Sequence, residues 1–460
     1  MPTAGGRAKK TMSDRPARAW STAYHAAWVY PVAGEPIADG TLIIEADRIV
    51  WVGPRAARRL SASVREVELG SVLLTPGLVN AHTHLDLTVL RGLLDGELFF
   101  EWIRSVVAAR DLLSPQETLD SALLGIVEGL QGGVTTYADT APGAEGFQAM
   151  KALGVRGVAY LELFGPDPVL CEQAMEGLRA RVGALRLDET PLVRLGVSPH
   201  APYSVSDALY AAVAAYARAE RLPLATHIGE SDAESQLVTD GGGAFAKFLN
   251  GRGIATTMRA RTPITMLEQN GVLGPNALLI HCIRCDDDDV AAIVRHDAGV
   301  VTCPYSNRYF GHGVAPVAAF VAAGVRLGVG SDSMASNRRM DLLAEACAAM
   351  PSSDARDGWR ECWKLATVGG ANALGLGDLI GTLEEGKQAD FAAYSVPAGS
   401  TIDEALWFAS SEGARAQLVV IGGSERVRDG RATADTSAIV ERASAATARI
   451  REWRALARAT

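Results

Sequence analysis

Eight short apolar runs recur through the middle of the chain, and this repetition is the feature that most constrains the fold. Stretches of helix-like composition separate most of the runs, for example residues 115–130, 207–220, 286–295 and 314–323. Strands that alternate with helices favour a parallel sheet, and eight repeats over about 300 residues predict a closed, TIM-like (β/α)8 barrel of the α/β class. The apolar runs are residues 72–79, 134–138, 156–161, 195–198, 222–226, 277–280, 299–302 and 325–330.

The alternative to a barrel is a doubly wound open sheet. Such sheets typically bind nucleotides through a glycine-rich turn after the first strand. No glycine-rich phosphate fingerprint follows the first apolar run here, so the barrel is the preferred prediction.

The two ends of the chain differ from the middle in their pattern of apolar and turn-forming residues. Residues 19–75 contain short β-rich runs broken by Gly, Pro and Asp, and similar runs return in residues 385–435. We expect these two segments to form one small β-sandwich domain beside a catalytic barrel of residues 76–384. We also expect a disordered tail over residues 1–18 and an exposed C-terminal helix over residues 436–460, which are rich in Ala, Arg and Glu.

Charge and cysteine content limit the partners that the chain is expected to have. The formal net charge of −9 argues against nucleic acid or an anionic membrane surface, and no apolar run is long enough to span a bilayer. No apolar segment follows the basic N-terminal residues, so no secretory signal is expected. The six cysteines are scattered, which favours reduced thiols and a cytoplasmic location. Cys282 and Cys285 form a lone C-x-x-C match, to which we assign no metal or redox role.

Histidines and acids follow the ends of the predicted barrel strands. His82 and His84 end the first strand, and because alternate residues of a strand point the same way, their imidazoles are expected side by side. In a barrel the carboxyl ends of the strands lie on one rim, where active sites are built. Five of the eight histidines therefore converge on one face, which disfavours five unrelated core histidines. The other strand-end residues are His200, His227, Glu230, His281 and Asp332.

This set of side chains suits a metal ion. Three imidazoles and one carboxylate are typical of a Zn²⁺ or Fe²⁺ site in which a water completes the coordination. The metal lowers the pKa of that water toward roughly 7, so hydroxide is available at neutral pH. Such chemistry also needs a proton carrier, and Glu230, three residues after His227, is placed to serve.

Five segments together resemble the amidohydrolase superfamily, and within it the branch of cytosine, guanine, adenosine-derivative and s-triazine deaminases and chlorohydrolases. The resemblance covers nearly the whole chain, and residues 381–390 match the branch's return from the barrel to the small domain. The five segments are residues 76–84, 198–203, 227–230, 281 and 330–333.

The resemblance implies one divalent metal ion, with zinc favoured and iron as the alternative. It also implies that Glu230 shuttles protons, that His281 polarises the water or the tetrahedral centre, and that His200 contacts the substrate. Binuclear relatives carry a carboxylated Lys on strand four, and residues 194–203 contain no Lys, so a mononuclear site is expected. The implied metal ligands are His82, His84, His227 and Asp332.

A second class of zinc deaminases carries an H-x-E motif and, later in the chain, P-C-x-x-C. No histidine of this chain is followed two residues on by Glu, and Cys282 follows His281 rather than a proline. That class is therefore excluded.

The resemblance implies hydrolytic deamination of an aromatic ring, in which Asp332 accepts a proton, Glu230 protonates a ring nitrogen and ammonia leaves. Residues 303–312 are similar to the loop after strand seven of aminofutalosine deaminases, whose substrate on the futalosine route to menaquinone is an adenine nucleoside that bears a benzoate. Arg308 is expected to bind that carboxylate through its planar fork, with a surface arginine as the alternative. Trp102 is expected to line the base pocket, with an anchoring aromatic of the loop as the alternative.

Other substrates and activities stay open. S-adenosylhomocysteine, methylthioadenosine, adenosine, guanine and s-triazines are close alternatives, and the same metal centre could hydrolyse a cyclic amide. A scaffold relative that lacks metal is disfavoured because every expected ligand is present. The expected partner is a purine nucleoside-like small molecule, and the oligomeric state is open, with a homodimer as one option.

Overall fold

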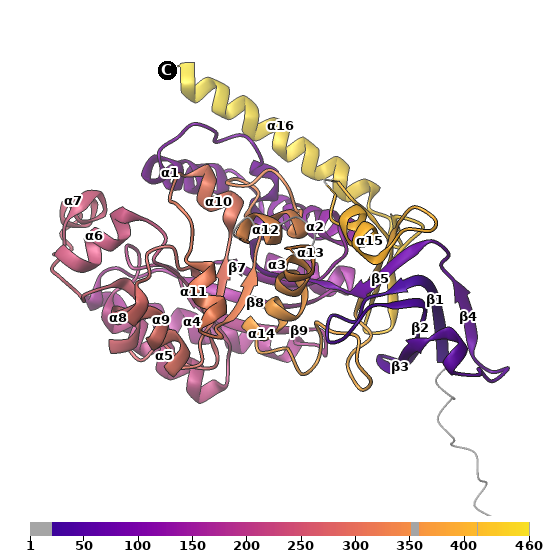
Figure 1. Cartoon of the computed structure of the whole chain (residues 1–460). Coiled ribbons are helices and arrows are strands. Elements are labelled where there is room, and N and C mark those ends of the chain that lie inside the picture. Colours follow the sequence, from indigo (N-terminus) through magenta and orange to yellow (C-terminus); the bar gives the residue numbers. More distant parts are fainter. Residues whose placement is uncertain (1–20, 351–357, 412, 460) are drawn as a thin grey trace, which may run out of the picture.

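The computed structural model describes residues 21–350, 358–411 and 413–459, and the tail predicted over residues 1–18 lies outside them. The described residues form two sheets of nine strands each. One sheet curls into the barrel, and the other, mostly antiparallel, lies beside it at one end of the molecule (Figure 1). The long helix α16 (Ser437–Ala459) runs across the outside of the barrel.

The barrel sheet is parallel. Its strands are β6 (Leu78–His84), β7 (Val134–Ala141), β8 (Arg156–Leu163), β9 (Val193–Pro199), β10 (Leu224–Ile228), β11 (Ala277–His281), β12 (Gly299–Thr302), β13 (Arg326–Val329) and β14 (Asp332–Ser333). They are ordered in the sheet as in the chain, and β14, which continues β13 after two residues, pairs with β6. The first and last strands therefore meet, and the predicted (β/α)8 barrel is confirmed.

Helices connect the strands and cover the outside of the barrel (Figure 1). The remaining helices are α1 (Phe99–Arg110), α2 (Pro115–Gln131), α3 (Glu145–Leu153), α4 (Cys171–Leu185), α5 (Asp207–Glu220), α6 (Asp232–Asp240), α7 (Gly243–Gly251), α8 (Pro263–Gln269), α9 (Asp287–Arg295), α10 (Pro304–Tyr309), α11 (Val317–Ala322), α12 (Leu342–Ala349), α13 (Gly358–Lys364), α14 (Gly370–Ala373) and α15 (Ile402–Ala409). The four helices expected between strands correspond to α2, α5, α9 and a shorter α11.

Side chains fix the starts of two of these helices. At α2, the Ser114 side chain accepts a hydrogen bond from the backbone N–H of Glu117, whose side chain accepts one from the backbone N–H of Ser114, and Pro115 follows. Asp286 and Asp289 form the same reciprocal pair at the start of α9. The acidic run at residues 286–289 thus begins a helix, where carboxylates are stabilised by the helix dipole.

The small domain is a mostly antiparallel sheet built from both ends of the described chain. Its strands are β1 (Ser21–Val29), β2 (Ile37–Glu45), β3 (Arg48–Pro54), β4 (Arg65–Glu68), β5 (Val72–Pro76), β15 (Phe391–Ser395), β16 (Ala416–Ile421), β17 (Ser424–Arg428) and β18 (Arg431–Ala432). Pairing of β5 with β15 joins the N-terminal and C-terminal segments into one sheet. Tyr24 and Phe391 pack edge to face in its core, with ring centroids 5.1 Å apart.

The apolar run before His82 is divided between the two sheets. β5 pairs with β1 and β15 in the small sheet, whereas β6 belongs to the barrel. Gly77 lies between β5 and β6, and a Cβ at this position would lie 2.2 Å from the side chain of Thr135. The apolar run over residues 72–79 is therefore two strands, and the chain passes from one sheet to the other at a position where a side chain larger than that of glycine would clash with Thr135.

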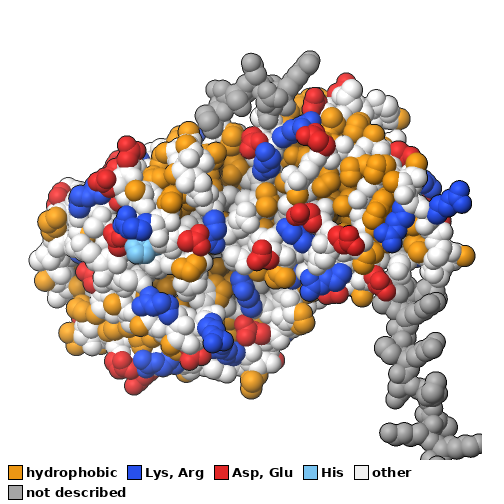
Figure 2. Space-filling view, turned by 60° about the horizontal axis from the view of Figure 1, so that its bottom comes forward, with side chains coloured by type: hydrophobic (Ala, Val, Ile, Leu, Met, Phe, Trp, Pro, Cys, Tyr) orange, Lys and Arg blue, Asp and Glu red, His pale blue; other side chains and the backbone are white. Residues whose placement is uncertain are grey.

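Charges of both signs are spread over the surface. On the face drawn in Figure 2, Lys and Arg side chains stand among Asp and Glu side chains, with apolar side chains between them. Among the described residues, no helix is both long and apolar enough to cross a membrane.

Candidate active site

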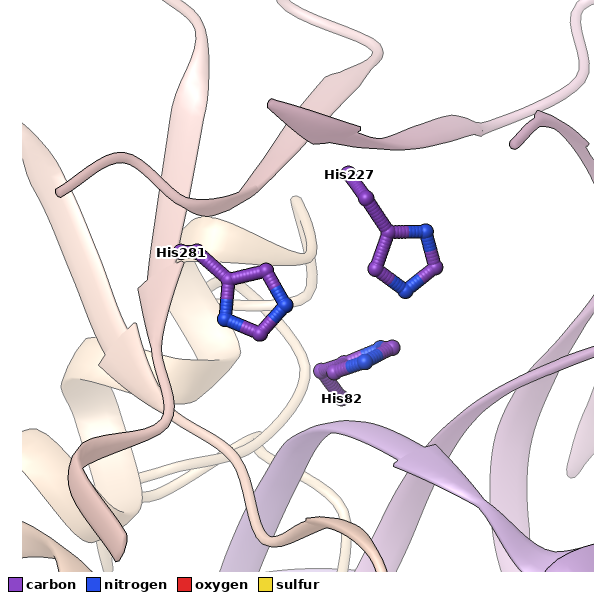
Figure 3. A group of neighbouring side chains, drawn as sticks. All are labelled: His82, His227 and His281. Atoms are coloured by element: carbon purple, nitrogen blue, oxygen red, sulfur yellow. The ribbon is translucent and has the colours of Figure 1, made fainter. Parts of the chain in front are cut away.

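The strand ends bring the predicted metal ligands together. His82 and His84 lie at the end of β6, His227 lies near the end of β10, and Asp332 begins β14. Figure 3 shows the rings of His82, His227 and His281 turned toward a common space from three separate strands. The rim of the barrel therefore gathers imidazoles that lie far apart in the sequence.

The donor atoms are spaced as ligands of one metal ion would be. Nε2 of His84 lies 3.3 Å from Nε2 of His227, and Oδ1 of Asp332 lies 3.5 Å from Nε2 of His82. Two nitrogens at the usual zinc distance in a tetrahedral arrangement are roughly 3.4 Å apart. Both ring nitrogens of His82 are buried and have no hydrogen-bond partner among the described residues, which a bond from one of them to a metal would explain. The residues present thus fit a divalent metal ion.

Hydrogen bonding and burial prepare His227 for metal binding. Its Nδ1 lies 3.2 Å from the carbonyl oxygen of His200, to which it donates its proton. Nε2 is then left unprotonated and faces the other ligands. Burial and the neighbouring imidazoles hold the pKa values of His227 and His84 well below the usual 6.5. Both rings are therefore neutral at pH 7, which is the form that binds metal.

The backbone is strained at two residues of the site. His281 has a φ of 75° and Asp332 a φ of 56°, in the left-handed region that residues other than glycine rarely adopt. The backbone N–H of Ser333 donates to Oδ1 of Asp332 at 2.7 Å, which helps to fix the carboxylate. Such strain concentrates at functional sites, where the surrounding structure holds the backbone in place.

Glu230 occupies a buried position beside the ligands. The Glu234 carboxylate accepts hydrogen bonds from the backbone N–H groups of Gly229 at 2.7 Å and Glu230 at 2.9 Å, which fixes the turn after β10. Oε1 of Glu230 lies 3.7 Å from Nε2 of His281. Burial, together with the charge of Asp332, raises the pKa of Glu230 well above the usual 4.5. Glu230 can therefore hold a proton at neutral pH, as a general acid must.

His281 is a neutral partner of this acid. Its Nδ1 lies 3.0 Å from Oδ1 of Asn307, so Nδ1 carries the proton and donates it to the amide oxygen. Burial lowers the pKa of His281 to about 4. Nε2 is then an acceptor that faces Glu230 and, at 3.9 Å, Oδ2 of Asp332.

A cleft opens to solvent beside these residues. Trp102 of α1 forms part of its wall and packs edge to face on Phe310, with ring centroids 4.8 Å apart. His200 also faces the cleft, and burial lowers its pKa to about 3, so the ring is neutral. Its Nδ1 lies 2.7 Å from the hydroxyl of Ser204. The predicted site residues that line the cleft are His84, Trp102, His200, His227, Glu230, His281 and Asp332.

Arg308 is not brought to this cleft. It lies on α10, whose buried residues are Ser306 and Asn307, and its side chain is exposed on another face of the helix. The guanidinium stacks over the ring of Tyr305, 5.3 Å from the ring centroid, and borders two neighbouring depressions instead.

Three further side chains at the site were not expected from the sequence. Nε2 of His312 lies 3.8 Å from Oε1 of Glu230, and its ring packs against Phe99 with centroids 4.6 Å apart. Arg110 and Glu162 line the cleft. Glu162 directly follows the apolar run of β8. The search for polar residues at the ends of predicted strands, which selected the other site residues, would therefore also have selected Glu162. His312 and Arg110 come from a loop and a helix, to which that search does not apply.

Fold and site together define a class of protein. A parallel barrel whose strand ends gather candidate metal ligands, beside a buried glutamate, has the arrangement of a metal-dependent hydrolase. A family model described as the Amidohydrolase family matches residues 73–426 of the chain. The protein belongs to this family, which confirms the resemblance found in the sequence.

Relatives of known name cover most of the chain. A 5-methylthioadenosine/S-adenosylhomocysteine deaminase of Syntrophobacter fumaroxidans is 31% identical over 398 residues, which are 83% of this chain and 86% of that protein. An aminodeoxyfutalosine deaminase of Deinococcus radiodurans is 29% identical over 340 residues, 70% of this chain and 78% of that protein. The crystal structure of an adenosine deaminase from Xanthomonas campestris with bound zinc matches with a TM-score of 0.78 and 26% identity, covering 95% of this chain and 100% of that one.

Proposed function

We propose that this protein is a zinc-dependent deaminase that hydrolyses the exocyclic amine of an adenine-type nucleoside, with aminofutalosine as the first candidate, to give the 6-oxo product and ammonia. The observation that carries the proposal is the buried Glu230, held beside His281 and the metal ligands in a cleft with aromatic walls. The names of the relatives support an adenine nucleoside as substrate, and they make 5-methylthioadenosine, S-adenosylhomocysteine and adenosine the alternatives. The zinc in the adenosine deaminase structure supports zinc over iron.

Asp332, Glu230 and His281 each have a separate role in the proton transfers of this reaction. His82, His84, His227 and Asp332 would hold the zinc ion, which would lower the pKa of a bound water toward roughly 7. Asp332 accepts a proton from that water through its carboxylate. Glu230, protonated because of its raised pKa, donates a proton to the ring nitrogen next to the reacting carbon. Nε2 of His281, left unprotonated by the bond from Nδ1 to Asn307, accepts a hydrogen bond that orients the water.

The walls of the cleft suit a planar base. Trp102 and Phe310 present aromatic rings beside the metal ligands, and Phe99 and Phe164 extend this apolar surface. Aromatic side chains pack on a flat heterocycle and exclude water from the reacting carbon. Electrostatic interactions between the substrate and the buried carboxyl groups are stronger in such a site than in water.

The proposal is tested by a screen for ammonia release. The purified protein is incubated with aminofutalosine, adenosine, 5-methylthioadenosine, S-adenosylhomocysteine, guanine and an s-triazine, before and after metal is removed with a chelator and restored with zinc or iron. We expect ammonia from one or more adenine nucleosides, loss of activity on chelation and better recovery with zinc. Activity only on triazines or free bases, or ring opening of a cyclic amide without ammonia, would contradict the proposal.

The predicted pairing of Arg308 with a substrate carboxylate is part of the same proposal. Because Arg308 is exposed outside the cleft, the carboxylate would have to be carried by a substituent that extends beyond the cleft. Arg308→Ala should then raise KM for aminofutalosine about tenfold or more and leave KM for adenosine unchanged. An equal change for both nucleosides would remove Arg308 from carboxylate binding. Arg179→Ala, at an exposed arginine of α4, is the matched control.

A further inference from the structure

Glu162 presents a buried carboxyl group that the reaction described above does not use. It lies at the carboxyl end of β8 with its side chain only 2% exposed, and it lines the cleft. Oε1 is fully enclosed and has no hydrogen-bond partner among the described residues. An unpaired polar group in a protein interior is costly, so a ligand that satisfies it is the simplest explanation.

The neighbouring side chains do not satisfy this carboxylate. Nδ1 of His227 is 3.9 Å from Oε1, beyond hydrogen-bond distance, and already donates to the carbonyl oxygen of His200. The guanidinium of Arg110 is bonded to Asp86 and forms no ion pair with Glu162 in the part of the chain that the structure describes. Oε1 of Glu162 is therefore left for a donor that comes from outside the protein.

Glu162 and Glu230 stand beside different imidazoles. A carboxylate oxygen of Glu162 lies within 4.8 Å of ring nitrogens of His84 and His227, whereas Glu230 lies beside His281. Because the two carboxyl groups lie beside different imidazoles, Glu162 contacts a different part of the substrate when Glu230 contacts the ring nitrogen next to the reacting carbon.

The chemistry of an adenine nucleoside limits what that part can be. Its only strong hydrogen-bond donors are the exocyclic amine, which is lost in the reaction, and the hydroxyl groups of the sugar. A carboxyl group is a common acceptor for ribose hydroxyls, and its unprotonated oxygen accepts a hydrogen bond whether the group is ionised or protonated.

We propose that Glu162 accepts a hydrogen bond from a hydroxyl group of the substrate's sugar and so selects nucleosides over free bases. The inference rests on the proposed function and narrows its substrate class to compounds that carry a ribose hydroxyl. A site built to bind a substrate hydroxyl rejects the analogue that lacks it, because the buried acceptor is then left unpaired.

The test combines protein variants with substrate analogues. Ammonia release is measured for the zinc-loaded wild type, Glu162→Gln and Glu162→Ala with adenosine, 2′-deoxyadenosine and 3′-deoxyadenosine. We expect the wild type to lose roughly 10- to 100-fold in kcat/KM on the analogue that lacks the contacted hydroxyl. Glu162→Ala should show a similar loss on adenosine and no further loss on that analogue, because both changes remove the same interaction. Glu162→Gln, which keeps an acceptor oxygen, should lose less.

Zinc content and melting temperature are measured for each variant as readouts that do not depend on activity. Glu172→Gln, at an exposed carboxylate of α4, is the matched control and should behave as the wild type on all three nucleosides. A loss of zinc in Glu162→Gln would instead assign Glu162 to the metal site and overturn the proposal.

Two kinetic outcomes separate this inference from the proposed function. If the wild type deaminates the nucleosides but Glu162→Ala lowers kcat by the same factor on all three, then Glu162 acts elsewhere, for example at the departing amine, and only this inference fails. If the wild type turns over no adenine nucleoside, with aminofutalosine, 5-methylthioadenosine and S-adenosylhomocysteine also assayed, but acts on other amino heterocycles, then the proposed function fails and the role of Glu162 fails with it.

Discussion

Burial sets the charge of the ionisable side chains around the cleft. It raises the pKa of Glu230 and lowers the pKa of His281 to about 4, because a low-dielectric surrounding disfavours the charged form of either group. At neutral pH the carboxyl group is therefore protonated and the imidazole is neutral, with the two groups 3.7 Å apart. This combination places a proton donor and an acceptor beside the proposed metal ligands.

Glu230→Gln should preserve the metal site and remove the proton carrier. We expect kcat to fall by about 10² to 10⁴, with KM and zinc content close to those of the wild type. Steady-state kinetics and metal analysis measure both quantities, and near-normal turnover would exclude Glu230 from proton transfer. Glu176→Gln, at an exposed position of α4, serves as the control.

Asp139 makes the stability of the metal-free protein depend on pH. Burial, reinforced by the neighbouring Asp86, raises the pKa of Asp139 from 3.8 to about 8. The folded state then binds a proton that the unfolded state releases, so the stabilisation is complete below pH 3.8 and is lost as the pH rises toward 8. From pH 6.5 to 8 we expect the free energy of unfolding to fall by about 1.7 kcal/mol in all for this group, with a slope near 1.4 kcal/mol per pH unit at pH 6.5 that halves by pH 8.

Denaturant titration of the chelated protein at pH 6.5, 7.2 and 8.0 measures this slope. Asp139→Asn should flatten it, since the amide oxygen can still accept the hydrogen bond that the Leu85 N–H donates at 2.7 Å. A slope that is unchanged in Asp139→Asn would show that another group is responsible. Glu162, whose pKa burial also raises to about 8, would then be the next group to substitute.

At the scale of elements, the C-terminal helix braces one wall of the cleft. Ala443, Ala446 and Ile450 of α16 are buried in one cluster with Trp102 of α1. The hydroxyl of Thr447 donates to the carbonyl oxygen of Val89 at 3.0 Å, in the short helical segment that follows β6. The last helix of the chain thus supports the segment that carries Trp102 into the cleft.

Ile450→Ala should loosen this support. We expect the free energy of unfolding to fall by about 2 to 4 kcal/mol, because the substitution opens a cavity at a fully buried position. KM should rise as well, since Trp102 packs in the same cluster. Val440→Ala removes a half-exposed side chain of the same helix and should have little effect on either quantity. Equal effects of the two substitutions would show that α16 does not brace the cleft.

At the scale of the whole molecule, one buried ion pair ties the small sheet to the barrel. Arg156 begins β8, and its Nε donates to Oδ2 of Asp390 at 2.6 Å, next to β15. Both side chains are buried, and a further guanidinium N–H donates to the Gln388 side chain at 3.1 Å. The backbone N–H of Gly422 donates to the same carboxylate at 2.8 Å, so Asp390 joins segments of both domains.

Arg156→Ala should destabilise the protein by about 3 to 5 kcal/mol, because it leaves the buried carboxylate of Asp390 without its counter-charge. Chemical denaturation monitored by tryptophan fluorescence measures the loss. Asp390→Asn in the same background should restore part of the stability, since it removes the unpaired charge. No recovery in the double variant would mean that packing, rather than charge, links the two domains.

Much of the barrel and of the metal site follows from local sequence patterns. The two-residue spacing of His82 and His84 places both imidazoles on one side of a strand whatever the rest of the chain does. The strand-end positions of His227, His281 and Asp332 then follow once the barrel is recognised, because parallel strands expose their carboxyl ends on the same rim. Asp286 likewise marks a helix start through its own hydrogen bond to the backbone.

Other features depend on contacts between segments that no spacing rule connects. Packing of a loop and of α1 brings His312 and Arg110 to the site. The orientation of α10 leaves the side chain of Arg308 outside the cleft. The division of one apolar run at Gly77 depends on the approach of Thr135 from the next barrel strand.

The sequence by itself determined the alternation of strands and helices and the histidines and acids at strand ends, because periods of two and 3.6 residues are properties of the local backbone. Only the tertiary structure decided which carboxyl groups hold a proton and which side chains form the cleft, because burial and convergence arise when distant segments pack together.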